Sequence, residues 1–515
     1  MLCARMAVLP SSAGVAVAAL APVLCALLQA GSAPPTYAPW HWTAVGFAVA
    51  GEALALWFVS RIVARGGAPA STLLWALVIL LAPWIGMGLY YLFPRRLQLR
   101  RLKRLRSSLE RWRGGVRPET RARGADSGPL PTIGPLCRLL QGIAPDGLSA
   151  GNRVRWLPAG ADFFAAAALA IQSARSFVHL QIYIFRPDAT GRHLLHLLAE
   201  AARRGVQVRL LYDSFGSWGL KAAHLRELRE AGARAEPCLP LLWKRRPFTV
   251  NLRNHRKLLV VDGELAFLGG RNIADEYAHD RFGTRRTWLD AMVQIEGPAV
   301  NALHDVFAGD WYHASDEELS DARWFPPPRL AGHDVVGVVV SGPDRDQQQL
   351  WLSVFQAIGA AKHSIELSSP YVVPPPALML ALEVAAARGV RVRIHTNGQA
   401  SEAFGLYHAQ RSYYRELIDA GVELFETSPD FNHAKLLVVD RSAVMIGSAN
   451  MDMRSAHLNF ELAVVLPDSP DLAAAVLATL DERSASSRRV VVDEARIPWL
   501  RRFVDGFCRL LSPLL

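Results

Sequence analysis

The sequence predicts an α/β protein in which N-terminal transmembrane helices precede two tandem α/β domains. Three observations carry this prediction. Long apolar stretches lie near the N-terminus, and a pattern of helix, apolar strand, helix and strand then occurs twice. A polar motif occurs once in each repeat. We therefore expect the two domains to be related by a pseudo-twofold axis, with one composite active site between them.

The expected organisation follows these features in chain order. Residues 1–94 form a membrane region with two or three transmembrane helices, and residues 95–132 form a basic juxtamembrane linker. Residues 133–325 form the first α/β domain and residues 326–490 the second. Residues 491–515 form an amphipathic C-terminal helix.

Three apolar stretches make up the membrane region. Residues 71–93 contain no charge and are long enough to cross a bilayer, although Pro83 predicts a kink, and we expect this stretch to be the clearest span. Residues 40–63 carry Glu52, which must face protein or an interface, and are still expected to span. Residues 6–30 are consistent with a third span or with a signal-like segment, and the sequence leaves both open.

The positive charge of the chain is concentrated beside these spans. The net charge is +11, and residues 95–124 alone contain twelve basic and two acidic side chains. The remainder is close to neutral, which disfavours a basic groove for nucleic acid and favours contact with anionic lipid headgroups. The positive-inside rule then predicts that residues 133–515 lie on the cytoplasmic side.

Each α/β domain repeats one plan. An Ala-rich helix leads to an apolar strand at 177–185 in the first repeat and at 364–368 in the second. A second Ala-rich helix follows, and it leads to strands at 207–212 and 391–396. Strands that alternate with helices in this way predict a mixed sheet flanked by helices in each repeat.

The polar motif places a His and a Lys two residues apart at the start of an apolar β-branched run, so both side chains point to one face of a strand. An Asp follows at the strand end, and a glycine-containing pair then leads to an Asn. One H-x-K alone would be consistent with chance on a solvated strand, but the duplication makes chance a poor explanation. At a constant offset of 178, the copies are His255, Lys257, Asp262, Gly269, Gly270 and Asn272, and His433, Lys435, Asp440, Gly447, Ser448 and Asn450.

Both copies resemble the paired signature of the phospholipase D superfamily, H-x-K-x4-D followed by G-G/S-x-N. The surrounding R-N-H-R-K, G-G-R-N-I-A-D-E-Y and N-M-D-M-R-S-A-H-L-N-F-E stretches resemble bacterial cardiolipin synthases of the phospholipase D type, over nearly the whole chain. The family usually shows W-R-D where this chain has W-L-D, so Leu289 departs from the pattern. P-Y-V-V-P-P at 370–375 is a second departure, and both bear on the preference for the donor lipid.

The resemblance implies roles for these residues. His255 is implied as the nucleophile that attacks phosphorus and His433 as the acid and base, with Asp262 and Asp440 counted in the same catalytic set. Lys257, Lys435, Asn272 and Asn450, with the backbone at Gly269, Gly270, Gly447 and Ser448, would bind the phosphate oxygens. A carboxylate should orient each imidazole, and Asp290 and Glu461 are the candidates.

The expected activity is that of a cardiolipin synthase in the bacterial inner membrane, which joins two phosphatidylglycerols and releases glycerol through a phosphohistidine. The alternative is a membrane-bound phospholipase D that hydrolyses phospholipid to phosphatidic acid. Two lysines can neutralise the phosphate, so no cofactor and no metal is expected. Nucleic acid is not expected as a partner, a vestigial scaffold would not need two complete motifs, and no sequence feature specifies an oligomeric state.

The segment from Trp499 to the C-terminus places its large apolar side chains on one helical stripe and its arginines elsewhere. The stripe is consistent with docking onto the rest of the protein and with contact at a membrane surface. The sequence favours neither.

Overall fold

A computed structural model represents the protein. It describes residues 40–64, 66, 69–92, 134–144, 147–239, 252–278, 288–343, 348–398, 404–428, 430–492 and 497–512. The possible span at 6–30 and the linker at 95–132 lie outside these ranges. The chain divides into two compact units, Met1–Arg95 and Arg96–Leu515, and each is described by itself.

The N-terminal unit contains the helices α2 (Trp40–Ala64), α3 (Pro69–Leu81) and α4 (Pro83–Leu92). Residues 42–64 form a helix long and apolar enough to cross a membrane. The kinked span expected at residues 71–93 is not confirmed, because the chain divides there into the two shorter helices α3 and α4. Pro83 has no amide hydrogen and its ring crowds the preceding turn, so the break falls where the kink was expected. Gly86 then lets α4 approach closely, since a Cβ there would lie 2.6 Å from the Cα of Ile79.

The second unit is built around one sheet. The described strands form a 16-stranded sheet whose principal path is β20-β14-β13-β11-β16-β17-β19-β10-β1-β9-β7-β6-β2-β3-β4. The first half of this unit contains β1 (Leu148–Leu157), β2 (Phe177–Ile182), β3 (Gln207–Asp213), β4 (Arg234–Cys238), β5 (Arg253–Asn254), β6 (Leu258–Val261), β7 (Leu265–Gly269), β8 (Trp288–Leu289) and β9 (Met292–Glu296). Its second half contains β10 (Asp334–Ser341), β11 (Ser364–Ser368), β12 (Val372–Val373), β13 (Arg391–Asn397), β14 (Glu423–Thr427), β15 (Phe431–Asn432), β16 (Leu436–Val439), β17 (Ala443–Gly447), β18 (Met451–Asp452), β19 (Asn459–Leu466) and β20 (Arg488–Arg489). Strands β8, β12, β15 and β18 form two separate two-stranded pairs.

The two halves have the same topology. Strands β2, β3 and β4 are parallel to one another, as are β11, β13 and β14, while β6 and β16 pair antiparallel to the first member of each set. The sequence-predicted strands at 177, 207, 364 and 391 are confirmed. Both β6 and β16 read L-L-V-V and are buried throughout, as continuous apolar runs in a sheet covered on both faces should be.

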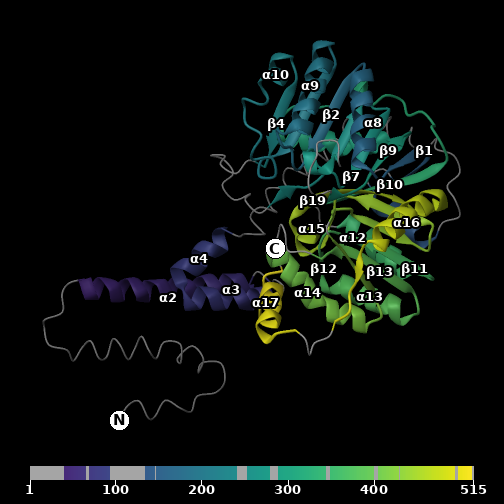
Figure 1. Ribbon diagram of the computed structural model, residues 1–515. Helices are drawn as coiled ribbons and strands as arrows, with labels where there is room; N and C mark the ends of the chain where they lie inside the picture. Colours follow the sequence, from purple (N-terminus) through teal and green to yellow (C-terminus); the bar gives the residue numbers. More distant parts are fainter. Residues whose placement is uncertain are drawn as a thin grey trace, which may run out of the picture. The chain divides into compact units, whose positions relative to one another are not determined.

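Helices cover both halves of the sheet (Figure 1). They are α8 (Gly160–Ser173), α9 (Ala189–Arg203), α10 (Arg226–Glu230) and α11 (Ala299–Ser315) in the first half, and α12 (Gln349–Ala360), α13 (Pro376–Ala387), α14 (Phe404–Asp419), α15 (Met453–His457) and α16 (Pro470–Ala485) in the second. Helix α7 (Pro135–Ile143) precedes them and α17 (Trp499–Leu510) follows them. The short 3-10 helices η2 (Asp275–Tyr277) and η4 (Ala322–Trp324) complete the described elements.

The halves are joined more closely than two tandem domains. Strand β1 pairs antiparallel with β10, from Leu148 opposite Gly337, so both halves share one sheet. Helix α7, which the sequence places in the first domain, packs against α12 and β10 of the second half through Leu136 and Leu140. The boundary at residue 326 therefore separates topological halves within one compact unit.

Two short strand pairs cross between the halves. Strand β5 pairs with the start of β19, with Arg253 opposite Asn459, and β15 pairs with β8, with Phe431 opposite Trp288. Each pair lays the residues just before one histidine along the other half. These two crossings define the site.

Candidate active site

Each motif histidine is positioned by a backbone bond to the opposite half. The amide of His255 donates to the carbonyl of Phe460 at 3.0 Å, and the amide of His433 donates to the carbonyl of Leu289 at 2.7 Å. Both imidazoles are buried. The Lys two residues later directly precedes the apolar run that forms β6 or β16. The local sequence therefore specifies the strand, and the strand pairs between the halves set the direction of the histidine.

The imidazoles are each held by a carboxylate, and the pairing is crossed. Nδ1 of His255 lies 3.1 Å from both carboxylate oxygens of Glu461, which belongs to the second half. Nδ1 of His433 lies 2.6 Å from Oδ2 of Asp290, which belongs to the first half. The sequence predicted these two carboxylates as candidate orienting groups, and each lies within hydrogen-bond distance of one imidazole.

Burial and charge keep both imidazoles neutral in the free protein. Burial lowers the pKa of His255 to about 4, against the raising effect of Glu461. Burial, followed by the charge of Lys435, lowers the pKa of His433 to about 3. Burial opposes ionisation of Glu461 and Asp290, but the adjacent histidines and lysines hold the pKa of each below its usual value. Each carboxylate is therefore an acceptor for an Nδ1–H group, which leaves Nε2 as the free base on the other side of the ring.

The two motif lysines share this buried environment. Nζ of Lys257 donates to the carbonyl of His255 at 2.7 Å, and Nζ of Lys435 donates to the carbonyl of His433 and lies 2.8 Å from its Nδ1. Burial lowers the pKa of Lys435 to about 8, and burial with the charge of Lys435 lowers that of Lys257 well below its usual range. Lys435 also lowers the pKa of His255, so the two copies act on each other electrostatically.

The two asparagines occupy different surroundings. The side chain of Asn272 accepts from the amide of Ile184 at 3.1 Å and donates to the hydroxyl of Tyr277 at 2.8 Å. The backbone amide of Asn450 donates to Oγ of Ser455, and its side chain lines a pocket together with Lys435. In the second copy the Lys and the Asn therefore line one pocket. In the first copy the side chain of Asn272 forms hydrogen bonds with the surrounding protein.

The glycine-containing pairs allow close packing against the carboxylate strands. A Cβ at Gly269 would lie 2.2 Å from the carbonyl oxygen of Ala291, and one at Gly447 would lie 2.5 Å from that of Leu462. A Cβ at Gly270 would lie 2.2 Å from Oδ1 of Asp290. Ser448 stands at the matching place and donates through Oγ to Glu461 at 2.5 Å. These residues help to position the carboxylates. The sequence had predicted only a phosphate-binding role for them.

Asp262 and Asp440 lie away from the histidines. The carboxylate of Asp262 accepts from the amides of Arg175, Ser176 and Phe177, and that of Asp440 accepts from those of Lys362, His363 and Ser364. Both aspartates have a left-handed backbone, at φ 54° and 50°. Their observed contacts are with the backbone at the start of β2 or β11, although the sequence analysis counted both in the catalytic set.

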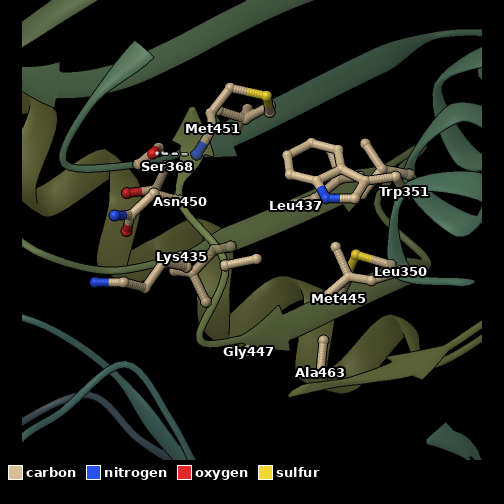
Figure 2. Close-up of a pocket in the computed structure, with 15 residues that line it drawn as sticks. Leu350, Trp351, Ser368, Lys435, Leu437, Met445, Gly447, Asn450, Met451 and Ala463 are labelled. Atoms are coloured by element: carbon tan, nitrogen blue, oxygen red, sulfur yellow. Dashed lines mark hydrogen bonds between the residues drawn. The ribbon is translucent and has the colours of Figure 1, made fainter. Parts of the chain in front are cut away.

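A pocket opens beside the second motif. It has a volume of about 40 Å³, and Lys435, Asn450, Ser368 and Ser369 contribute its polar lining. Figure 2 shows Lys435 and Asn450 on one side and an apolar group that includes Trp351 and Met445 on the other. The equivalent of Ala449, which also lines it, is Arg271 in the first copy, whose buried guanidinium donates to the carbonyls of Tyr277 and Asp290.

Several residues at the site escaped the sequence reasoning. The ring of Tyr183 packs edge-on against His255 at 4.8 Å, and those of Tyr277 and Trp288 pack against His433 at 5.4 and 5.1 Å. Ser455 and Asn459 donate to Oε1 of Glu461. Both lie inside the N-M-D-M-R-S-A-H-L-N-F-E stretch, so the sequence could have indicated them. No local pattern indicates Tyr183.

Two α/β halves that share one sheet and cross their His–carboxylate pairs at a buried, lysine-lined site define a protein of the phospholipase D superfamily. Comparisons with known proteins agree. A family model described as "Cardiolipin synthase, PLD-like domain" matches residues 168–311 and 354–483, and a "Phospholipase_D-nuclease N-terminal" model matches residues 53–95. The chain belongs to the cardiolipin synthase family.

Individual relatives support this placement. A cardiolipin synthase of Geobacillus thermodenitrificans is 36% identical over 87% of this chain and 89% of its own length. One of Halalkalibacterium halodurans is 32% identical over the same shares, and cardiolipin synthase 2 of Bacillus anthracis is 33% identical over 87% of each chain. The solved structure of a phosphatidylserine synthase of Haemophilus influenzae has a TM-score of 0.56 at 15% identity, covering 70% of this chain and 95% of that one, and it shows a shared fold.

Proposed function

We propose that this chain is a phosphatidyltransferase that joins two phosphatidylglycerols to form cardiolipin and releases glycerol. The observation that carries the proposal is the pair of crossed contacts, His255 with Glu461 and His433 with Asp290, in a site that also holds Lys257 and Lys435. Membership of the cardiolipin synthase family supplies the substrate class. The reaction needs a nucleophile, a proton carrier and positive charge around a phosphodiester, and these residue types provide all three.

In the first half-reaction, Nε2 of His255 attacks the phosphorus of the donor lipid. The phosphorus–oxygen bond to the glycerol headgroup breaks, and His433 delivers a proton to the departing glycerol oxygen. The product is a phosphatidyl-histidine. Glu461 stabilises the positive charge that forms on His255, because its carboxylate accepts the Nδ1–H of the same ring.

In the second half-reaction, His433 has lost its proton and acts as the base. It takes the proton of a headgroup hydroxyl on a second phosphatidylglycerol, whose oxygen attacks the same phosphorus. The bond to His255 breaks, and cardiolipin leaves with both histidines restored. Asp290 holds the ring of His433 through Nδ1 in both steps.

The bound phosphodiester adds a negative charge that the free site does not have. With both imidazoles neutral, the two lysines face two carboxylates, and the phosphodiester adds one negative charge. That anion raises the pKa of the lysines and of His433, which burial and mutual repulsion lower in the free protein. Lys257, Lys435 and Asn450 then bind the non-bridging oxygens, and no metal is needed to neutralise them.

The N-terminal apolar helix associates the chain with a membrane, as the substrate requires. The proposed arrangement is a multi-pass anchor in the bacterial inner membrane with the catalytic body on the cytoplasmic side, supported by the basic run that follows residue 94. The same run would hold the body against anionic lipid.

The test is a product analysis with purified full-length protein and phosphatidylglycerol vesicles. We expect cardiolipin and free glycerol in equal amounts, with phosphatidic acid a minor product, because both histidines are buried from bulk water. Added EDTA should not change the rate. Phosphatidic acid as the main product would make the protein a hydrolase, and an absolute need for phosphatidylethanolamine would change the donor but leave the mechanism.

A further inference from the structure

Helix α17 turns its apolar side outward. Trp499, Phe503 and Leu510 are 72%, 62% and 76% exposed, and Leu500 and Phe507 are exposed beside them. At about 100° per residue these side chains fall within a continuous arc of roughly 120°. A helix that only completes a protein core buries such an arc. The exposure of this arc therefore indicates an interaction surface.

Polar contacts hold the opposite side of α17 against α14. Asp505 accepts from Nδ1 of His408 at 2.5 Å, and Arg509 forms a two-pronged ion pair with Glu416 at 2.5 and 3.0 Å. The guanidinium of Arg509 also lies 4.1 Å from the ring centre of Tyr413. These directional bonds set the rotation of α17 about its own axis, and the apolar arc therefore stays outside.

Helix α17 is also tied to the active site. Cys508 packs in a small cluster with Ala409 of α14 and Val373 of β12. Strand β12 pairs with β18, where Val373 lies opposite Asp452, two residues after Asn450. Figure 1 shows α17 beside α14 on the second half of the sheet. Side-chain packing and one strand pair therefore connect the helix that carries the outward arc to the pocket wall at Asn450.

We propose that α17 is an interfacial anchor that inserts its apolar arc into the headgroup boundary of an anionic phospholipid bilayer. The exposed Arg501 and Arg502, which lie outside the arc on the polar side of the same helix, supply the charge complementarity, and an apolar stripe with cations on the polar face is typical of helices that lie in the plane of an interface. The contact orients the catalytic body so that the wall at Asn450 faces the lipid. It rests on the proposed function only for the premise that the substrate lies in a bilayer.

The test places a reporter on the arc of the full-length protein. Phe503→Cys carries an environment-sensitive fluorophore, with Cys3 and Cys25 replaced by Ser, while Cys137, Cys238 and Cys508 are buried. The matched control is Leu169→Cys on α8, which is 67% exposed. Both proteins are reconstituted in vesicles of phosphatidylglycerol and phosphatidylcholine, with or without a nitroxide-bearing lipid.

The nitroxide lipid should quench the label at residue 503 at least about threefold more than the label at residue 169. Equal quenching at the two sites, with equal access to aqueous iodide, would overturn the anchor. Shielding of the label at residue 503 that increases with the protein-to-lipid ratio, with no quenching by the nitroxide lipid, would also overturn the anchor. It would assign the arc to a second copy of the chain. Neither readout depends on turnover, so failure here is distinguishable from failure of the proposed function.

A kinetic arm uses the triple variant Trp499→Ser, Phe503→Ser, Leu510→Ser with Leu169→Ser as its control. Turnover on vesicles should fall about tenfold in the triple variant, while turnover on short-chain phosphatidylglycerol dispersed in detergent stays within about twofold of wild type. A loss on both substrates would point to a damaged fold, and the anchor would be rejected if vesicle turnover were unchanged.

Discussion

The two motif copies share their backbone design and differ in their side chains. In each, the histidine amide donates to a carbonyl of the other half, the lysine donates to the histidine carbonyl, and the aspartate accepts three backbone amides. The carboxylate that holds each imidazole comes from the opposite half. Each His–carboxylate pair therefore takes one member from each half, so the proposed catalytic unit is the joined pair of halves.

The differences give the two histidines unequal surroundings. Glu461 receives side-chain bonds from Ser448, Ser455 and Asn459 in addition to His255, so the first imidazole faces a well-braced acceptor. Asp290 is shorter and sits against Gly270. Arg256, which donates both to Asp310 and to the carbonyl of Glu461, has Ala434 as its counterpart. The duplicated motif has thus diverged at the residues around the two carboxylates, as the separate roles proposed for the two histidines would require.

The largest expected effect comes from removing either imidazole. His255→Asn and His433→Asn should each lower turnover at least about 10³-fold, because attack and proton transfer are separate steps of one cycle. Protein incubated with short-chain phosphatidylglycerol and denatured at alkaline pH, where the P–N bond of a phosphohistidine is stable, should carry a phosphatidyl adduct on the peptide with residue 255, as read by mass spectrometry. The adduct should be absent in His255→Asn and form slowly in His433→Asn.

The opposite pattern of adducts would exchange the two roles without disturbing the composite site. Near-normal turnover in either variant would contradict the shared site itself. Leu169→Ser, at an exposed position of α8, provides the control for handling and folding.

An exchange of residues between the copies should have unequal effects. Gly270→Ser would place a Cβ 2.2 Å from Oδ1 of Asp290 and displace the carboxylate that holds His433, so kcat should fall about 100-fold or more. Ser448→Gly leaves room and removes one hydrogen bond to Glu461, which should cost about tenfold or less. Steady-state kinetics on one lipid preparation measures both. Equal losses would show that the two carboxylates are held in equivalent ways.

The paired aspartates should affect stability more than rate. Asp262→Asn and Asp440→Asn each weaken the acceptor of three backbone amides at the start of β2 or β11, and should lower the free energy of unfolding by about 1–2 kcal/mol. Their kcat should change only about twofold to threefold, since neither carboxylate touches an imidazole. Thermal unfolding and initial rates separate the two quantities. A collapse of kcat at unchanged stability would return these residues to the catalytic set.

The smallest expected difference between the copies is in acid sensitivity. The imidazoles titrate at about 4 and about 3 in the folded protein, against 6.5 ordinarily. Below pH 6.5 the unfolded chain binds protons that the folded protein does not. Stability therefore decreases as the pH is lowered, until each folded pKa is reached. His255→Gln and His433→Gln should each flatten this fall, with an integrated effect of roughly a few kcal/mol.

The effect of His433 should extend about one pH unit lower than that of His255, in keeping with its lower pKa. Melting temperatures of the three proteins, measured between pH 7 and pH 3 in one detergent, test this. Variants as acid-sensitive as wild type would show that the buried imidazoles do not carry the linkage.

Local pattern was enough to predict much of this molecule. Identical L-L-V-V runs behind two H-x-K motifs mark β6 and β16, and the period-two geometry of a strand places each His and Lys on one face. Proline chemistry located the break at Pro83, where the structure divides the expected span at 71–93 into two shorter helices. Asp290 and Glu461 were recognisable as candidate partners, because buried imidazoles with a fixed tautomer need an acceptor.

Tertiary structure alone decided how these pieces combine. The crossing of Glu461 to His255 and of Asp290 to His433 depends on β5 pairing with β19 and β15 with β8, and hydrogen bonds between residues more than 140 positions apart leave no local signal. The same is true of α17, whose stripe was visible in the sequence while its direction was not. Periodicity reports which side chains share a face, but only the partners of Asp505 and Arg509 determine that this face points away from the protein.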